Sequence, residues 1–128
     1  MRALLLASSL LAVTNAVAQE GSTASAVAPV IALYACDTGK TVTATYDDTG
    51  EAPQVVLRIG EKDYTLQAVP SGSGVRYATE RGPMQGQLFT WWIKGDEAVW
   101  LESPIGGVVK PEEEKLVATC KKSSSPPQ

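Results

Sequence analysis

The chain has 128 residues, a formal net charge of −3 at neutral pH and no histidine. This length allows one domain with a modest core and is too short for two. The lack of histidine removes the commonest general base and the Ser-His and Cys-His nucleophile pairs, and the acidic balance argues against nucleic acid as a partner. We therefore do not expect an enzyme.

The first eighteen residues have the three parts of a secretory signal peptide. Arg2 supplies the positive charge, residues 3–13 form the apolar part, and Ala16 and Ala18 form a small-residue cleavage site. The apolar run is shorter than the roughly 20 residues of a membrane-spanning helix, and no cysteine follows it to carry an acyl chain. We predict a signal peptide over residues 1–18, a periplasmic or secreted protein and no membrane anchor. Loss of Arg2 lowers the net charge from −3 to −4.

Two segments flank the expected domain. Residues 19–29 are rich in alanine, serine and threonine and have no periodic apolar pattern, which predicts a flexible lead-in. Residues 121–128 end in SSSPPQ and predict a disordered tail. The folded domain is therefore expected over residues 30–120.

The apolar pattern within this domain is short, alternating and interrupted by turns, as in β-strands. In residues 40–46, Val42, Ala44 and Tyr46 share one face, and three threonines share the other. No segment has a 3.6-residue period of helical length. The pattern predicts an all-β fold, either a small antiparallel β-barrel of about eight strands or a sandwich. The expected strands are Val30–Cys36, residues 40–46, Gln54–Ile59, Lys62–Val69, residues 74–79, Gln87–Lys94, residues 97–101, residues 107–110 and residues 115–120.

One expected hairpin brings two polar residues together. Residues 81–86 (RGPMQG) predict its bend, and a centre in the middle of this bend gives cross-strand pairs whose numbers add up to 167. Ser73 then lies opposite Lys94, and Tyr77 lies opposite Thr90. Opposed residues share one face of the sheet, with Cβ atoms about 5 Å apart. A shift of one residue would place Ser73 and Lys94 on opposite faces.

The two cysteines, Cys36 and Cys120, lie near the two ends of the domain. In an oxidising compartment such a pair forms a disulfide, and closing so long a loop stabilises a fold by roughly 4 kcal/mol. Two thiols without a histidine cannot assemble the usual zinc sites. We predict one structural disulfide, no metal site and no cofactor.

Neither the acidic nor the aromatic residues form a catalytic set. Adjacent acids such as Asp96 and Glu97 are expected to be solvated, because neighbouring residues of a strand point to opposite faces. Phe89, Trp91 and Ile93 alternate on one face of their strand and are expected to pack in the core. A nucleobase-stacking role would need a basic groove beside the tryptophans, which the sequence does not supply.

Four pieces of the sequence, in this order, resemble the bacterial inhibitors of c-type lysozyme. They are YAC at residues 34–36, SGSGVRY at residues 71–77, WIKGDEA at residues 92–98 and the terminal Cys120. This family has membrane-bound and periplasmic members, often called MliC and PliC. The resemblance implies an eight-stranded antiparallel barrel with a disulfide between Cys36 and Cys120. Because no cysteine is available for an acyl anchor, the chain resembles the periplasmic form.

The resemblance also implies a partner, c-type lysozyme, and two inhibitory residues. A serine of the first segment and a lysine of the second correspond here to Ser73 and Lys94. A lysozyme cleft holds two carboxyl groups around a cationic transition state. The Lys94 ammonium would take the place of the developing positive charge, and the Ser73 hydroxyl would hydrogen-bond the second carboxyl group.

Other interpretations of these segments stay open. Taken alone, Ser73 is typical of a turn and Lys94 of a solvated hairpin tip. Tyr77 is a candidate for the lysozyme interface or for the core. Arg76 is a further candidate for the interface, or a partner for the nearby acids of residues 96–97.

Residues 80–87 lengthen the hairpin by about half a dozen residues relative to the family pattern. This loop would add contacts to lysozyme or obstruct the cleft. Two other functions compete with inhibition, namely a small barrel that binds an apolar ligand and a cell-envelope stress protein that does not inhibit. A barrel of about 90 residues is largely filled by its own side chains, which disfavours the apolar ligand.

Overall fold

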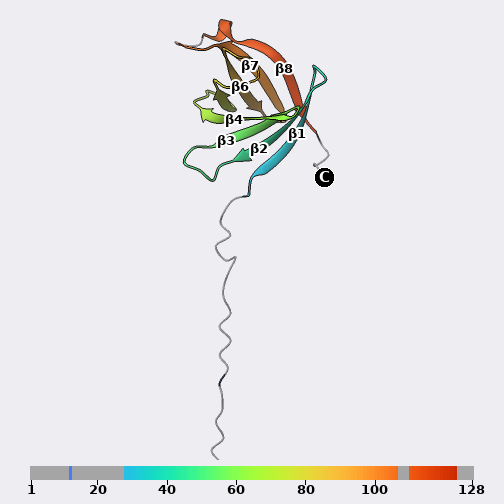
Figure 1. The fold of residues 1–128 in the computed structure, drawn as a ribbon, viewed down its shortest axis with the longest axis vertical. Helices are drawn as coiled ribbons and strands as arrows, with labels where there is room; N and C mark the ends of the chain where they lie inside the picture. Colours follow the sequence, from blue (N-terminus) through green and yellow to red (C-terminus); the bar gives the residue numbers. More distant parts are fainter. Residues whose placement is uncertain (1–11, 13–27, 107–109, 124–128) are drawn as a thin grey trace, which may run out of the picture.

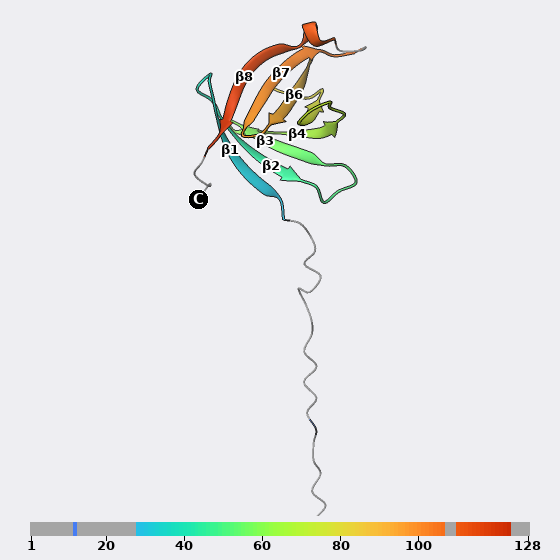
Figure 2. The same cartoon turned by 180° about the vertical axis from the view of Figure 1, so that it is seen from behind.

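The computed structural model describes residue 12, residues 28–106 and residues 110–123. The eight strands of this part form one closed antiparallel barrel in the order β1-β2-β3-β4-β5-β6-β7-β8 (Figures 1 and 2). The closed barrel confirms the all-β prediction and decides against the sandwich. The strands are β1 (Val30–Cys36), β2 (Thr41–Asp47), β3 (Gln54–Ile59), β4 (Lys62–Val69), β5 (Val75–Thr79), β6 (Gln87–Lys94), β7 (Glu97–Pro104) and β8 (Lys115–Lys122).

The strand bounds differ from the sequence prediction mainly near the C-terminus. β7 continues to Pro104, and β8 continues to Lys122, which pairs with Tyr34 of β1. A 3-10 helix, η1 (Pro111–Glu113), lies between them. The strand expected over residues 107–110 falls mostly outside the described residues. So do the expected signal peptide and most of the expected lead-in.

The inner face of the barrel is filled by side chains. Trp91, Phe89, Leu57 and Leu66 are at most 1% exposed, and the rings of Tyr34 and Trp91 pack edge to face with centroids 5.2 Å apart. This filling weighs against an apolar ligand inside the barrel. The buried core consists of Ala32, Tyr34, Cys36, Val42, Ala44, Val55, Leu57, Leu66, Tyr77, Phe89, Trp91, Ala98, Trp100, Ala118 and Cys120.

The alternation read from the sequence explains this packing. In β6, Phe89 and Trp91 are buried and Ile93 packs against the core, as predicted. Successive residues of a strand point to opposite faces, so Trp92 and Lys94 of the same strand face outward. The pattern that fills the core therefore also presents the polar residues of the WIKGDEA segment to solvent.

A disulfide closes the barrel between its first and last strands. Cys36 and Cys120 are direct cross-strand partners and are bonded to each other, which confirms the prediction. Only three residue pairs join β1 to β8, whereas six join β1 to β2. The two strands meet in both views of the ribbon (Figures 1 and 2). The covalent bond thus reinforces one of the shortest strand pairings of the barrel, which we call the β1-β8 seam.

The expected register of the β5-β6 hairpin is wrong by one residue. Arg76 pairs with Trp92, so the paired residue numbers add up to 168 and not 167. The pair nearest the turn is Thr79 with Phe89, so nine residues, 80–88, lie between them, and the hairpin is centred on Met84, half a residue later than expected. By extension of this register, Gly74 lies opposite Lys94. Ser73 is therefore not the cross-strand partner of Lys94.

Three polar groups meet inside the barrel. The hydroxyl groups of Tyr34 and Tyr46 are hydrogen-bonded at 2.8 Å, and the Trp91 indole N–H donates to the Tyr46 hydroxyl at 3.1 Å. Burial raises the pKa of the Tyr46 phenol well above its usual value, and its hydrogen bond with Tyr34 raises it further. Burial also raises the pKa of Tyr34. The folded barrel therefore requires these phenols to stay neutral.

We predict that the free energy of unfolding falls as the pH rises above about 10, the usual pKa of a tyrosine in an unfolded chain. Because the folded pKa values are raised, the stabilisation is complete below that pH and is lost as the pH rises toward the folded values. The slope reaches up to about 1.4 kcal/mol per pH unit for each such tyrosine. Denaturant unfolding between pH 8 and pH 11 measures it. Tyr46→Phe should reduce the slope, and an unchanged slope would contradict this assignment.

Candidate functional site

The two segments that resemble the inhibitor family meet at one end of the barrel. Residues 70–74 connect β4 to β5 and residues 95–96 connect β6 to β7, and in an up-and-down barrel these connections share an end. The loop of residues 80–86 connects β5 to β6 and lies at the opposite end. Residue 80, where this loop begins, is six residues along β5 from residue 74, a distance of about 20 Å.

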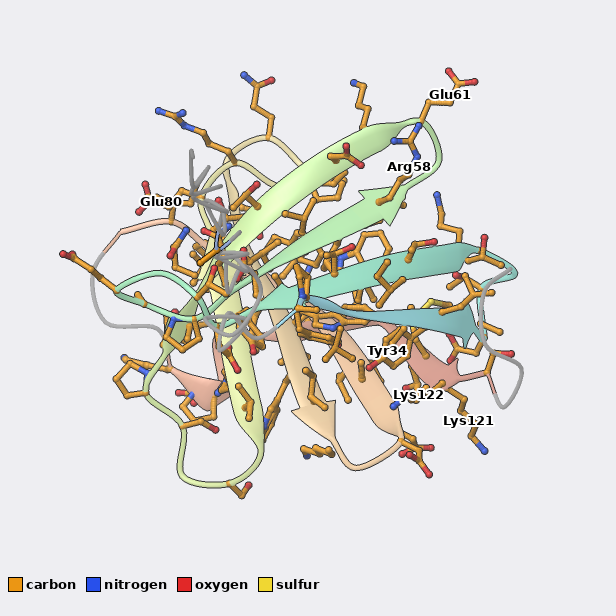
Figure 3. The ribbon with its side chains drawn as sticks, turned by 90° about the horizontal axis from the view of Figure 1, so that it is seen from below. Tyr34, Arg58, Glu61, Glu80, Lys121 and Lys122 are labelled. Atoms are coloured by element: carbon orange, nitrogen blue, oxygen red, sulfur yellow. A yellow bond between two sulfur atoms is a disulfide. The ribbon has the colours of Figure 1, made fainter. Side chains whose placement is uncertain are left out.

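The place of the long loop in the barrel bears on the expected role of residues 80–87. Glu80 and the pair Lys121 and Lys122 lie on opposite sides of the molecule in the view from below (Figure 3). Lys122 is beside the β6-β7 connection, because its backbone N–H donates to the Asp96 carbonyl at 2.8 Å. The long loop therefore lies away from the β6-β7 connection, and its effect on lysozyme binding stays a prediction.

Lys94 ends β6 and is exposed on the outer face of the barrel. Its ammonium lies 3.6 Å from the centroid of the Trp92 ring, two residues earlier on the same face. Such a cation–π contact is favourable because the negative face of the indole attracts the charge. None of the ion pairs among the described residues involves Lys94. Its charge is therefore held by an aromatic ring and is available to an external carboxylate.

Ser73 lies in an exposed loop that is held by its backbone. Its carbonyl accepts a hydrogen bond from the Trp92 indole N–H at 2.8 Å and a second from the Ser71 hydroxyl at 2.5 Å. The Ser73 side chain is exposed to solvent. Trp92 thus contacts both predicted residues, the ammonium of Lys94 through its ring and the Ser73 loop through its N–H.

Gly74 allows this loop to approach β6. Its φ is +63°, and a Cβ atom at this position would lie 2.2 Å from the Ile93 carbonyl oxygen. A side chain therefore meets both a strained backbone conformation and a steric clash. The glycine after Ser73 is needed where the loop crosses the strand that carries Lys94.

We predict that Gly74→Ala lowers the free energy of unfolding by about 1–3 kcal/mol, the usual range for a residue forced into a strained backbone conformation. Gly72→Ala is the matched control in the same loop, because a Cβ there meets no atom within 4 Å. Its effect should stay within about 0.5 kcal/mol. Denaturant unfolding of the two variants compares them directly. Equal effects would contradict a specific need for glycine at position 74.

Arg76 has a different partner from the one expected. Its guanidinium forms an ion pair with the Glu114 carboxylate, with side chains only 22% and 17% exposed, and not with the acids of residues 96–97. The guanidinium carbon also lies 4.6 Å from the centroid of the Trp92 ring. Glu114 follows η1 in the connection between β7 and β8, so the ion pair ties this connection to β5. Arg76 therefore has a structural partner within the chain.

Tyr77 belongs to the core. It is 5% exposed and points inward, with its ring centroid 5.9 Å from that of Tyr46. It pairs with Trp91 and not with Thr90, as the corrected register requires. Burial raises the pKa of its phenol. Of the two alternatives for Tyr77, packing is the one that the structure supports.

Charges of both signs surround the tip of the β6-β7 hairpin. Lys121 lies 3.9 Å from a Glu97 carboxylate oxygen, and both side chains are largely exposed. Such a pair contributes about 0–1 kcal/mol, because solvent screens it. Asp96 and Lys94 are exposed beside it. The tip is thus a mixed and solvated surface that a charged partner can approach.

No group of three or more metal-ligating side chains occurs in the part of the chain that the structure describes. Within the same residues, no helix is long and apolar enough to cross a bilayer.

Comparison with known proteins connects this site to a family. Residues 34–103, more than half of the chain, match the family described as membrane-bound lysozyme-inhibitor of c-type lysozyme, MliC. The chain belongs to this family. The matched region contains both segments at the end of the barrel and the whole of β2 to β6. MliC proteins are described as inhibitors, which agrees with the expectation of a binding protein and not an enzyme.

One curated relative supports the same assignment. A protein of Cupriavidus necator, named membrane-bound lysozyme inhibitor of C-type lysozyme, is 36% identical to this chain over 64 residues. The alignment covers 50% of this chain and 46% of the relative. No solved structure gives a significant match.

Proposed function

We propose that this chain is an inhibitor of c-type lysozyme that blocks the catalytic cleft with Lys94 and Ser73. The observation that carries the proposal is the exposed Lys94 ammonium at one end of an MliC-family barrel, linked to the Ser73 loop through Trp92. The family and the relative from Cupriavidus necator both carry the name of a c-type lysozyme inhibitor. The two residues come from the two segments that resemble this family.

The chemistry of the target suits this pair. The cleft of a c-type lysozyme contains a protonated carboxylic acid and an ionised carboxylate, which act on a substrate that gains positive charge in the transition state. A lysine ammonium placed between them substitutes for that charge. The Ser73 hydroxyl donates a hydrogen bond to one carboxyl group and accepts one if the group is protonated.

The geometry favours Lys94 over Arg76 and Lys121. The Arg76 guanidinium is already paired with Glu114 and is mostly buried, and Lys121 lies beside Glu97. Lys94 is exposed, and its charge has no carboxylate partner among the described residues. Its removal from water costs desolvation energy, which a lysozyme carboxylate offsets.

Export is part of this proposal, because lysozyme acts outside the cytoplasm. The expected signal peptide over residues 1–18 and the disulfide between Cys36 and Cys120 support a periplasmic or secreted protein without a membrane anchor. The relative, in contrast, is named membrane-bound. Mass measurement of protein recovered from the periplasm, with an N-terminus at Gln19, tests this part of the proposal. A chain that retains residue 1 or sediments with membranes would contradict it.

Charge should accelerate association. The chain without residues 1–18 carries a net charge of −4, whereas c-type lysozymes are usually basic, so long-range attraction steers the encounter. We predict that raising the salt concentration slows association more than it accelerates dissociation, because the Debye length is about 8 Å at physiological ionic strength and shorter above it. Surface plasmon resonance at several salt concentrations measures both rates. An association rate that does not respond to salt would exclude steering.

An inhibition assay tests the proposed function itself. The purified chain from Gln19, with its disulfide intact, is titrated into c-type lysozyme, and lysis of bacterial cell walls is measured. Activity should fall as the inhibitor approaches equimolar amounts, if the affinity resembles that of other enzyme–inhibitor complexes. Full activity at a large molar excess would reject the proposal. Parallel assays with g-type and i-type lysozymes measure how far inhibition extends.

A further inference from the structure

Trp92 connects the two residues of the proposed inhibitory pair. Its ring centroid lies 3.6 Å from the Lys94 ammonium, and its indole N–H donates to the Ser73 carbonyl at 2.8 Å. The strand register alone does not join Ser73 to Lys94, because Gly74 is the residue opposite Lys94. A single side chain therefore supplies the link that the backbone pairing does not.

The Arg76 guanidinium adds a third contact to the same ring. It lies 4.6 Å from the ring centroid and is held by its ion pair with Glu114. Gly74 lets the loop come close enough for the indole N–H, since a Cβ atom at this position would lie only 3.1 Å from the Trp92 nitrogen. Trp92 is thus packed by neighbours on β5 and in the loop and is half-buried. A ring fixed in this way can hold the ammonium of a flexible lysine in one position.

We propose that Trp92 is a positioning residue of the lysozyme-binding end, which arranges Lys94 and Ser73 before lysozyme is bound. This inference rests on the proposed function and deepens it. A free lysine side chain samples many rotamers and loses that freedom on binding. A cation–π contact that holds the ammonium near its bound position reduces this loss, which is the general advantage of preorganisation. The hydrogen bond to the Ser73 carbonyl does the same for the loop.

The free protein provides the first test. The face of an indole ring shifts the NMR signals of nearby protons upfield, so the Lys94 side-chain methylene protons should be shifted in the parent protein. Trp92→Leu should return them to the values of a solvated lysine, and Trp92→Phe should retain part of the shift. Lys62, an exposed lysine at the opposite end of the barrel, is the internal control, and its signals should be the same in all three proteins. Unshifted Lys94 signals in the parent would overturn the proposal.

The second test uses binding to c-type lysozyme. Trp92→Leu should weaken the affinity about tenfold, and Trp92→Phe, which keeps an aromatic face, should restore about half of this loss on a logarithmic scale. In a Lys94→Ala background, Trp92→Leu should change the affinity less than threefold, because the main group that it positions is gone. Thermal unfolding and the NMR spectrum of each variant establish that it is folded.

The two tests separate the possible failures. If Trp92→Leu weakens binding equally with and without Lys94, Trp92 contacts lysozyme directly and the positioning role is wrong. If the parent protein does not bind c-type lysozyme at all, the proposed function fails. The NMR measurement on the free protein still decides whether Trp92 holds Lys94.

Discussion

Lys94→Ala should weaken inhibition of c-type lysozyme more than any other single exposed substitution in this chain. Truncation leaves a lysozyme carboxylate buried in the interface without its counter-ion, which typically costs about 2–5 kcal/mol, or roughly 30-fold to several thousand-fold in affinity. Ser73→Ala removes a neutral hydroxyl and should cost about 1 kcal/mol. It leaves the Ser73 carbonyl, and hence its hydrogen bond with Trp92, in place.

Two further variants separate charge from packing. Lys94→Met keeps a long side chain over the Trp92 ring and removes the charge, so it should lose nearly as much affinity as Lys94→Ala. Lys62→Ala removes an exposed lysine from the far end of the barrel and should bind lysozyme like the parent. The double variant of Ser73 and Lys94 should lose less than the sum of the two single losses, because the residues act as a unit. A folded Lys94→Ala variant that inhibits like the parent would show that the cleft-blocking mechanism is wrong.

Removal of the disulfide should produce the largest loss of stability. Cys36 and Cys120 are 84 residues apart in sequence, so their bond excludes many conformations of the unfolded chain. The chain-entropy model gives about 4 kcal/mol for a loop of this length. A domain of about 90 residues has a total stability of roughly 5–13 kcal/mol, so the bond would account for between about a third and most of it. The loss would also leave the short β1-β8 seam without its covalent link.

The double substitution Cys36→Ala with Cys120→Ala tests this prediction without leaving a free thiol. Denaturant unfolding of the oxidised parent and the double variant, in the same buffer, gives the difference in free energy of unfolding. Reduction of the parent by dithiothreitol should lower its stability by a similar amount and should leave the double variant unaffected. A difference below about 1 kcal/mol would mean that the strand pairing closes the barrel by itself.

Much of the fold follows from local patterns in the sequence. Alternation in β2 and β6 predicts which residues face inward, because a buried face in a barrel is defined by the two-residue period of the strand. The even number of cysteines, in a domain that is expected to be exported, predicts the disulfide between β1 and β8. The barrel itself follows from the many short strands without helical periods and from the family resemblance.

The register of the β5-β6 hairpin could not be predicted in the same way. It depends on the number of residues that leave the ladder at the turn, and Arg81, Gly82 and Gln87 do not show where the strands stop pairing. The centre of the hairpin lies at Met84, half a residue later than residues 81–86 suggest, and this moves every cross-strand pair by one position. Ser73 is consequently not opposite Lys94, as the sequence predicted, although both residues lie at the same end of the barrel.

The contacts of the site come from residues that are distant in sequence. Arg76 pairs with Glu114, 38 residues away, because the connection between β7 and β8 brings that glutamate to β5. The acids of residues 96–97 are nearer to Arg76 in the sequence, and no sequence pattern favours Glu114 over them. The WIKGDEA segment alone gives Trp92 no particular role, but the strand alternation that sends Trp91 inward already sends Trp92 outward. An outward tryptophan beside the signature lysine is the signal that would have identified it.

Competition with an oligosaccharide in the lysozyme cleft tests the central claim most directly. The chain from Gln19 is titrated into a c-type lysozyme at increasing concentrations of a short chito-oligosaccharide that occupies the cleft. If Lys94 and Ser73 enter the same cleft, the apparent Kd of the chain should rise in proportion to the oligosaccharide concentration once this exceeds its own Kd, by about tenfold for each tenfold increase. An apparent Kd that stays constant at saturating oligosaccharide would place the chain elsewhere on lysozyme and would contradict the account.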